Sequence, residues 1–321
     1  MRRLGVGVIG LGRWGRNYLK TLARLPDCSI KAVADRDRSA LAGVQPGLRT
    51  FSSHEALLDD PDVRAVVIAS PDETHYELAR AALAAGRDVL VEKPMATNVR
   101  DAEMLVELSL ARGLVLLVGH TMLYHRGFDR LEQTVASGSI GRIARLTAAR
   151  TSSGASHRRT NVLQDLVPHD LAMAIVLLGM PVAARARAGR DSGPSLSYQL
   201  LFPGDAVMFG WAAWQTPPHV RRLRVSGTRG TAVFTDGPID PDERLDITNT
   251  PLGRQCGDFI ASSLHRTTPA SDGRQGLLVT RSAAALAKSQ AAGGAWIPVS
   301  PALSHSTGQP ADAAACACEP A

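Results

Sequence analysis

The chain of 321 residues is 45% hydrophobic, carries a formal net charge of +6, and is long enough for about two folded domains. Its basic residues are scattered, and the densest run, residues 219–230, contains no aromatic residues, so we expect an affinity for anionic substrates and no nucleic-acid partner. The four cysteines form no zinc or disulfide framework, and the chain has neither a signal peptide nor an apolar run of about 18 residues, so it is expected to be cytoplasmic, with no metal and no membrane partner.

The first predicted elements are an apolar strand, a glycine-rich turn and a helix, over residues 4–25. Gly10, Gly12 and Gly15 in the turn fit the pattern G-x-G-x-x-G. That spacing allows a tight turn and a close approach of the backbone to a pyrophosphate at the helix N-terminus. Because the motif follows a strand and precedes a helix, it predicts a dinucleotide site, although an ordinary glycine-rich turn is the alternative.

A second predicted strand, residues 29–35, ends at Asp35, where a carboxylate would accept hydrogen bonds from the adenosine ribose. A carboxylate repels a 2′-phosphate, so Asp35 favours NAD. The neighbouring Arg36 is positioned to hold such a phosphate, so NADP is not excluded.

Strands and helices continue to alternate up to about residue 120, which predicts a parallel, doubly wound sheet with its ligand site at the carboxyl ends of the strands. We expect Asp72 to cap the helix over 72–86. The predicted strands span 62–70, 88–94 and 114–120, and the helices 72–86 and 98–113. Polar or proline residues end these strands, at Ser70, Pro71, Glu92, Lys93 and His120.

Lys93 is notable because it is one of only four lysines among 36 lysine and arginine residues. It lies at the carboxyl end of a strand that we predict to be buried. Because ligand sites lie at the carboxyl ends of parallel strands, we expect its side chain to project into the cofactor cleft. A lysine ammonium can polarise a hydroxyl and its pKa shifts readily, whereas an arginine stays protonated. The sequence therefore predicts a chemical role for Lys93.

A second polar group lies in residues 161–181, where the pattern predicts a helix from 166 to 178. We expect Asp165 to be its N-cap, Pro168 to lie in its first turn, and Gly179 to end it. Asp165 and His169 are four residues apart and would share one face. From the residues alone two interpretations stay open: an acid/base pair, or a cap and a packed histidine.

These motifs together resemble the Gfo/Idh/MocA oxidoreductases, over roughly residues 4–300. The resemblance rests on GVIGLGRWG (7–15), SPDETH (70–75), EKP (92–94), VGHTMLYH (118–125), GSIGRI (138–143), DLVPHD (165–170) and the stretch 211–236. It implies an N-terminal Rossmann domain with a doubly wound parallel sheet. It also implies a C-terminal α/β domain with a large, mainly antiparallel open sheet, whose open face commonly makes a dimer contact.

The resemblance also implies roles for individual residues. Catalysis would rest on Lys93, on His169 as general acid/base, and on Asp165 beside it. Cofactor binding would involve Gly10, Gly12, Arg13, Trp14, Gly15, Asp35, Arg36, Ser70, Pro71, His75, Glu92, Lys93 and His120. Substrate binding would involve Lys93, Tyr124, Arg158, Asn161, Asp165 and His169. Many relatives carry an Arg-aromatic pair where this chain has Leu123 and Tyr124, which resembles the branch acting on nucleotide-linked or amino sugars.

The predicted function is NAD(P)-dependent hydride transfer at a ring secondary alcohol of a sugar, sugar nucleotide, amino sugar or cyclitol, by a homodimer or homotetramer. The alternatives are a reductase of a non-sugar carbonyl or imine, and a dinucleotide-binding sensor without turnover.

We expect a Rossmann domain over 1–121, a substrate and oligomerisation domain over 122–301, and a disordered tail over 302–321. A hairpin is predicted over 226–236 and a helix over 272–294. Trp211 and Trp214 are expected in the core or a dimer contact.

Overall fold

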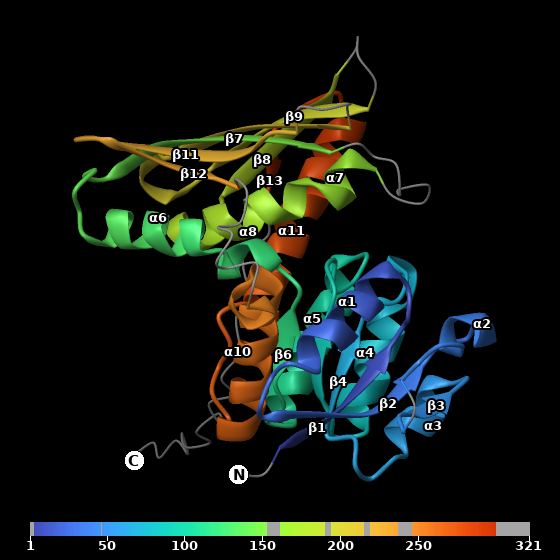
Figure 1. The fold of residues 1–321 in the computed structure, drawn as a ribbon. Helices are drawn as coiled ribbons and strands as arrows, with labels where there is room; N and C mark the ends of the chain where they lie inside the picture. The colour runs from blue at the N-terminus through green and yellow to red at the C-terminus, as the bar shows by residue number, and fades with distance from the viewer. Residues whose placement is uncertain are drawn as a thin grey trace, which may run out of the picture.

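The computed structural model describes residues 3–45, 47–152, 161–189, 194–214, 219–236 and 246–299. They form two layers, a parallel sheet with helices on both faces and, beyond it, a second sheet with helices on the side that faces the first layer (Figure 1). The tail over 302–321 and Arg158 lie outside these residues. No helix among them is long and apolar enough to cross a membrane.

The first layer is the predicted Rossmann sheet, with six parallel strands in the order β3-β2-β1-β4-β5-β6. Its strands are β1 (Leu4–Ile9), β2 (Cys28–Ala34), β3 (Arg49–Phe51), β4 (Ala65–Ile68), β5 (Asp88–Val91) and β6 (Leu116–Val118). Strands β4 and β5 are buried throughout, as expected for a sheet covered on both faces; β4 is wholly apolar and β5 is apolar after Asp88. This confirms the predicted class of the first domain.

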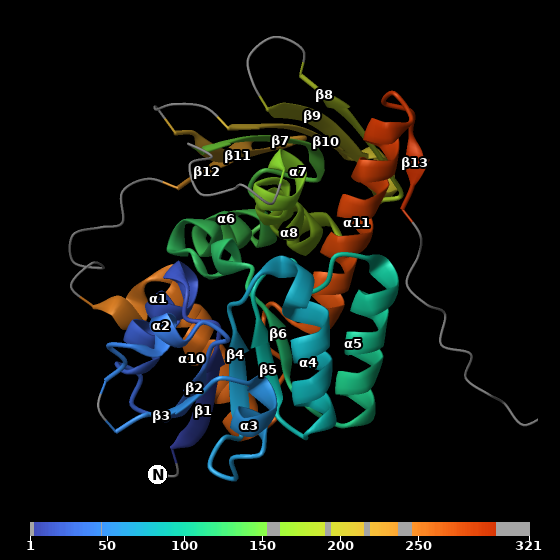
Figure 2. The ribbon, with the colours of Figure 1, turned by 90° about the vertical axis from the view of Figure 1, so that its right-hand side faces the viewer.

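Helices cover both faces of this sheet (Figure 2). One face packs against α1 (Arg13–Leu22), the other against α3 (His54–Leu58), α4 (His75–Ala84) and α5 (Val99–Ala111), while α2 (Arg38–Leu41) follows β2. The prediction that Asp72 caps a helix over 72–86 is wrong. Asp72 begins a 3₁₀ turn, η1 (Asp72–Thr74), and α4 follows without a side-chain cap, because the turn itself leads the chain into the helix.

The second layer is a seven-stranded sheet in the order β12-β11-β7-β10-β9-β8-β13. Its strands are β7 (Ile143–Ser152), β8 (Ala183–Ala188), β9 (Ser195–Leu201), β10 (Val207–Trp214), β11 (Arg221–Gly227), β12 (Thr231–Thr235) and β13 (Ile297–Pro298). Only the β7–β10 pair among them is parallel, so the expected mainly antiparallel sheet is confirmed. Strands β11 and β12 form the predicted hairpin.

The described helices of this layer all lie on one side of the sheet (Figures 1 and 2). They are α6 (Arg126–Ala136), α7 (Val162–Asp165), α8 (Val167–Leu178) and α11 (Gly273–Ala291). Alternate strand residues point to them, such as Leu196, Tyr198 and Leu200 of β9, and all three are buried. Helix α11 also contacts α5 and β6, and α10 (Pro251–His265) packs on α1, so both late helices touch the Rossmann layer.

The prediction for the segment that carries Asp165 is wrong in one respect. Asp165 is the last residue of α7 and not the N-cap of a helix, and Leu166 separates α7 from α8. Pro168 causes the break, because it has no N–H to donate to the carbonyl four residues earlier and its ring would clash with that carbonyl. The end of α8 at Gly179, with φ 76°, agrees with the prediction.

Candidate active site

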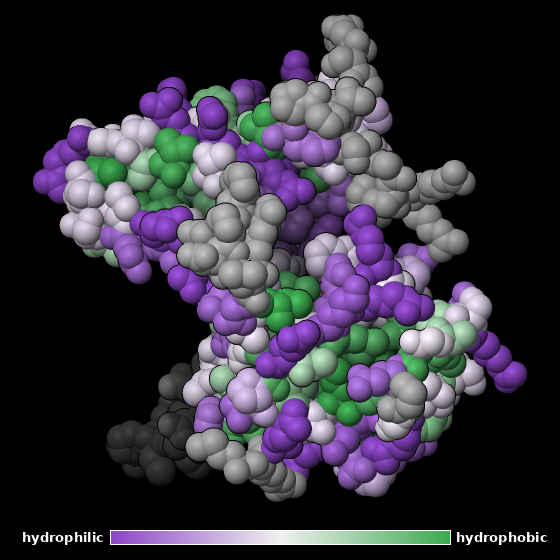
Figure 3. Space-filling model, in the orientation of Figure 1, coloured by the Kyte–Doolittle hydropathy of each residue, from purple (hydrophilic) through white to green (hydrophobic). Residues whose placement is uncertain are grey.

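Lys93 lies in a cleft between the two layers, and its Nζ atom reaches the second layer. Nζ donates a hydrogen bond to the backbone oxygen of Asp165 at 3.0 Å and lies 3.5 Å from Oδ1 of that residue. Figure 3 shows a recess lined by hydrophilic residues between the layers. The strand end β5 and helix α7 therefore present an ammonium and a carboxylate to the same space.

Glu92, the residue before Lys93, ties the end of β5 to Tyr18 of helix α1. It is almost buried, and its carboxylate accepts hydrogen bonds from the Tyr18 hydroxyl at 2.7 Å and from the Lys93 amide at 3.1 Å. Gln255 on α10 donates to the same tyrosine oxygen at 2.9 Å. Burial raises the pKa of the Glu92 carboxyl, opposed by the Tyr18 hydrogen bond. Glu92 thus positions Lys93 from beneath the cleft.

Asp165 is held in place by a tryptophan of the second sheet. The indole Nε1 of Trp214, the last residue of β10, donates to Oδ2 of Asp165 at 3.1 Å. One carboxylate oxygen thus faces Lys93 while the other accepts from Trp214. Trp214 is partly buried and packs against the hydrophobic core, as expected, but it also orients a residue of the site, which was not predicted.

His169, in the first turn of α8, shares this cleft. Its pKa lies well below the usual histidine range, because of burial first and then of the charges of Arg150 and Lys93. Nδ1 is buried and has no hydrogen-bond partner among the described residues, whereas the side chain as a whole stays partly accessible. At neutral pH the ring is therefore an uncharged imidazole, as a proton acceptor requires.

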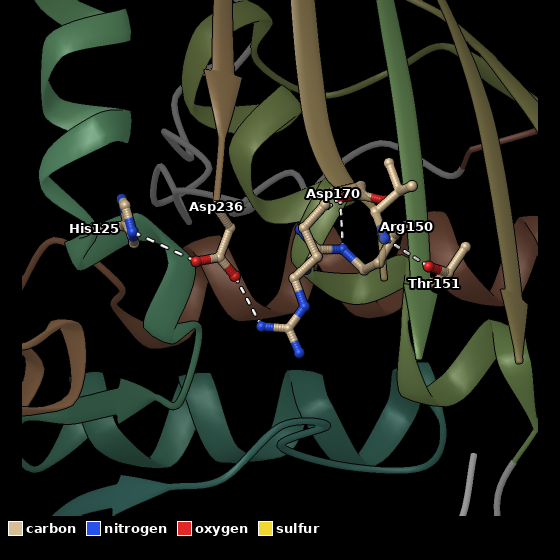
Figure 4. Close-up of polar contacts among 7 residues, drawn as sticks. His125, Arg150, Thr151, Asp170 and Asp236 are labelled. Atoms are coloured by element: carbon tan, nitrogen blue, oxygen red, sulfur yellow. Dashed lines mark hydrogen bonds and ion pairs between the residues drawn. The ribbon is translucent and has the colours of Figure 1, made fainter. Parts of the chain in front are cut away.

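Behind His169 lies a buried ion pair between β7 and α8 (Figure 4). Arg150 Nε and Nη2 each lie 2.8 Å from Asp170 Oδ1, and the Tyr198 hydroxyl donates to Asp170 Oδ2 at 3.0 Å. All three side chains are almost completely buried. Since Asp170 follows His169 directly, this cluster fixes the first turn of α8 against the sheet.

A second ion pair lies at the rim of the cleft (Figure 4). Asp236, just after β12, is 2.8 Å from Nη1 of Arg221 on β11, and its other oxygen is 3.5 Å from His125 Nε2. His125 Nδ1 accepts a hydrogen bond from the Gly127 amide at 3.0 Å, so in the neutral ring the proton is on Nε2, facing Asp236. The three side chains therefore form one connected group.

The glycine-rich turn has the shape that a dinucleotide needs. A Cβ atom on Gly15 would lie 1.8 Å from the Gly10 carbonyl oxygen, so close packing demands glycine there. Gly10 has φ +91°, whereas a Cβ on Gly12 would meet nothing within 4 Å. The open space at Gly12, the N-cap of α1, is where a pyrophosphate would pass.

Asp35 stands directly after β2, next to this turn. Its Oδ2 accepts from the Leu11 amide at 2.7 Å and its Oδ1 from the Asp37 amide at 2.9 Å. Arg36 and the two residues after Gly12, Arg13 and Trp14, are exposed beside it. The carboxylate is therefore held at the turn, in the place expected for a ribose ligand.

The loop after β4 is tied to the loop after β5 by a histidine. His75 is fully buried, and its two ring nitrogens lie 2.9 Å from the Ser70 carbonyl oxygen and 2.7 Å from the Pro94 carbonyl oxygen. Both ring nitrogens are thus engaged by these two loops, and direct cofactor contact by His75 stays a prediction. Ser70 and Pro71 remain at the strand end, partly exposed or exposed.

A cavity of about 770 Å³ lies beside the site, between the strand-end loops, α7–α8 and α11. His120 and Asn161 line it. His120 is 1% exposed, with no hydrogen-bond partner for either ring nitrogen in the described part of the chain. Asn161 caps α7 by accepting from the Gln164 amide at 2.9 Å. Both residues therefore border this cavity.

Tyr124 takes a different position from that expected of a substrate ligand. It is 5% exposed, and its hydroxyl donates to Asp258 on α10 at 2.8 Å. Its contacts join η2 (Thr121–Tyr124) to α10, so its role in substrate binding stays a prediction.

Three residues of the cleft were not predicted, namely Trp214, Arg150 and Arg221. Polar and apolar residues alternate along β7 and β11 in the sequence. Which of the two faces lines the cleft depends on contacts between elements that are far apart in the chain. Only the acidic partner next to His169, Asp170, gave a local signal for a buried cation.

Comparison with known proteins agrees with this architecture. Residues 4–120 match the model of an "Oxidoreductase family, NAD-binding Rossmann fold", and residues 128–233 match the "GFO/IDH/MocA C-terminal domain". The solved structure of GenD2 from gentamicin A biosynthesis, in complex with NAD, has a TM-score of 0.85 at 23% identity and covers 94% of this chain and 97% of that one. At that identity the likeness concerns the fold.

Two curated relatives are more similar in sequence. Inositol 2-dehydrogenase 2 of Saccharopolyspora erythraea is 34% identical over 198 residues, 59% of this chain and 58% of the relative. UDP-N-acetylglucosamine 3-dehydrogenase of Acidithiobacillus ferrooxidans is 31% identical over 188 residues, 58% of each protein. These matches span less than two thirds of either relative. With both family domains matched in order and the strand-end lysine facing the α7–α8 helix pair, the chain belongs to the Gfo/Idh/MocA family of NAD-binding oxidoreductases.

Proposed function

We propose that the protein is an NAD-dependent dehydrogenase that acts on a ring secondary alcohol of a sugar, sugar nucleotide, amino sugar or cyclitol, or on the corresponding ketone in reverse. The observation that carries this proposal is the approach of Lys93 to Asp165, beside a histidine kept neutral by burial. The matched relatives include an inositol dehydrogenase and a sugar-nucleotide dehydrogenase.

The residues of the cleft divide the work of alcohol oxidation. The Lys93 ammonium donates a hydrogen bond to the substrate hydroxyl and stabilises the negative charge that develops on its oxygen. His169 takes the hydroxyl proton at Nε2, since Nδ1 is the buried ring nitrogen. Asp165, oriented by Trp214, holds the lysine in place. Bound NAD supplies the hydride acceptor.

The first layer suits that cofactor. Gly10, Gly12 and Gly15 leave space for the pyrophosphate at the start of α1, and Asp35 offers carboxylate oxygens to the adenosine ribose. A carboxylate disfavours the 2′-phosphate of NADP, while the exposed Arg36 beside it is the group that would accommodate it. The nicotinamide end would lie towards Ser70, Pro71 and Lys93.

The proposal is tested by following absorbance at 340 nm with NAD or NADP and a panel of sugars, sugar phosphates, sugar nucleotides, amino sugars and inositols. We expect turnover of at least one ring alcohol, faster with NAD than with NADP. Tight NAD binding without turnover of any compound in either direction would contradict the proposal and favour a non-sugar carbonyl substrate or a sensor.

We also propose that two copies meet through the face of the second sheet that the helices leave uncovered, in a cytoplasmic homodimer or homotetramer. Phe209 and Trp211 of β10 are each 37% exposed on that face, and Arg145 lies 5.4 Å over the Phe209 ring. Light scattering coupled to gel filtration tests this, because Trp211→Asp should shift the protein towards the monomer. A wild-type monomer would contradict it.

A further inference from the structure

Two arginines stand directly opposite each other on the face of the second sheet that looks into the cleft. Arg150 of β7 and Arg221 of β11 are paired in the antiparallel register. Along β11, Arg221 alternates with the buried Leu223 and Val225, so it projects from the inner face. Like charges directly opposite one another destabilise a sheet. A negative charge close to the two arginines is therefore needed to offset their repulsion.

The charge of Arg150 is compensated within the protein. It is 3% exposed, and Nε and Nη2 both contact Asp170 Oδ1 at 2.8 Å. Tyr198 donates to the other oxygen of that carboxylate. Arg150 is therefore a structural cation that fixes α8.

Arg221 is only partly compensated. Its Nη1 contacts Asp236 Oδ2 at 2.8 Å, and the Asp236 carboxylate is 12% exposed and is also approached by His125. The Arg221 side chain is 45% exposed, and neither Nε nor Nη2 makes a hydrogen bond to the part of the chain that the structure describes. Asp236 thus engages one nitrogen of the guanidinium, Nη1, while the Nε–Nη2 edge stays available to a ligand.

The strand register places Arg221 near the first turn of α8. Arg221 pairs with Arg150, and the Arg150 guanidinium contacts Asp170, the residue that follows His169. The charge of Arg221 is also a minor cause of the lowered pKa of His169. Arginine donates hydrogen bonds and accepts none, and its paired N–H groups match the two oxygens of a carboxylate or a phosphate.

We propose that Arg221 is the specificity-determining residue of the cleft and binds an anionic oxygen group carried by the substrate, either a carboxylate or a phosphate. This inference rests on the proposed function and narrows its substrate class to acidic ring alcohols: uronates, sugar phosphates or sugar nucleotides. Neutral sugars and cyclitols lack a group that this edge recognises with two charge-assisted hydrogen bonds.

The test compares neutral glucose with derivatives of the same sugar that carry a carboxylate, a phosphate or a nucleoside diphosphate. Glucose is measured against glucuronate, glucose 6-phosphate and UDP-glucose, with myo-inositol as the neutral cyclitol, by NADH formation. We expect the wild-type enzyme to prefer an anionic member, and the preferred member distinguishes a carboxylate from a phosphate. Arg221→Met should reduce kcat/KM for that member roughly ten- to a hundredfold and change the neutral compounds little, as expected for hydrogen bonds to a charged group.

Arg222→Met is the matched control, because Arg222 is the next residue of β11 and is exposed on the opposite face of the sheet, away from the cleft. That face is the proposed contact between two copies, so gel filtration must show that the variant keeps the oligomeric state of the wild type. Arg222→Met should leave both classes of compound unchanged. Arg221→Lys keeps the charge and the partner for Asp236 but removes the forked donor, so it should fold normally and still lose most of the preference. Thermal-shift titration with glucuronate and with glucose 6-phosphate, in the presence of NAD, reads binding without turnover.

The outcomes separate this inference from the proposed function. Turnover of neutral compounds that matches or exceeds that of anionic ones, or an equal loss for both classes in Arg221→Met and Arg221→Lys, overturns the anion site alone. Absence of turnover and of a thermal shift for these compounds and for the wider panel above, in a protein that binds NAD, overturns both.

Discussion

The buried His120 offers a stability test with a defined magnitude. The ring is 1% exposed, and neither nitrogen has a partner among the described residues. Burial, and secondarily the charge of Lys93, lowers its pKa to about 3. In the unfolded chain the pKa would be about 6.5. The folded state must therefore hold this histidine neutral over a range in which the unfolded state protonates it.

The sign and size of the effect follow from linkage. Between about pH 6.5 and pH 3 the unfolded state binds one more proton at this site, so the free energy of unfolding falls as the pH falls, by about 1.4 kcal/mol per pH unit. From pH 7 to pH 5 the site should cost about 2 kcal/mol of stability. His120→Phe keeps an aromatic ring of similar shape and removes the titration, so it should lose this contribution.

Urea unfolding at pH 7 and pH 5 measures the difference in the free energy of unfolding for each protein. We expect the wild-type loss of stability to exceed that of His120→Phe by about 2 kcal/mol. His219→Phe, at an exposed histidine, should keep the wild-type difference. An equal loss in wild type and His120→Phe would refute the reasoning, because it would mean that His120 titrates alike in the folded and unfolded chain.

Three further predictions concern the cofactor turn and the catalytic group. Gly15→Ala should lower Tm, because its Cβ would clash with the carbonyl oxygen of Gly10. Gly12→Ala has open space around its Cβ, so it should keep Tm but weaken NAD binding in calorimetry. The reverse pattern would refute the assignment of Gly12 to the pyrophosphate site. Trp214→Phe removes the hydrogen bond to Asp165 and should lower kcat/KM about tenfold or more, so an unchanged value would remove Trp214 from the site. Because His169 has a lowered pKa, the acid limb of kcat/KM for alcohol oxidation should lie below pH 6.5, and a limb above pH 7 would contradict its role as base.

Most of the first layer could be predicted because its signals are local, but the edge strand β3 and the short helices α2 and α3 were missed. The sequence of β3, Arg49-Thr50-Phe51, has no apolar run to mark it. The other parallel strands are short, mainly apolar runs, and the parallel fold places their ends at one edge. The position of Lys93 in a cleft follows from that rule, since it comes directly after β5. The predicted boundary at residues 121 and 122 stays a prediction, as α10 and α11 pack on both layers.

The break between α7 and α8 was missed although a local signal existed. Asn161 and Gln164 have the N-cap and N3 spacing of a helix start, four residues before the cap that was predicted at Asp165. A helix that starts there reaches Pro168 too late for the proline to be harmless, because it has no N–H for the Gln164 carbonyl. With Asn161 taken as the N-cap, Asp165 falls at the end of a single helical turn, as the structure has it.

The cations and the tryptophan of the second layer could not be predicted for a different reason. Arg150 and Arg221 meet only through the β7–β11 register, and Trp214 meets Asp165 across 49 positions of the chain. Periodicity shows that such residues alternate between two faces of a strand, but the face that lines a cleft depends on non-local pairing. These residues therefore needed the structure.

The central claim is that Lys93 and His169 act on one substrate hydroxyl, and variants at these two residues test it most directly. For Lys93→Met and His169→Asn, we would measure NAD binding by calorimetry and NADH formation with the best substrate of the panel. We predict that each variant still binds NAD and loses kcat by about a hundredfold or more. Turnover within a few-fold of wild type in either variant, with NAD still bound, would contradict it.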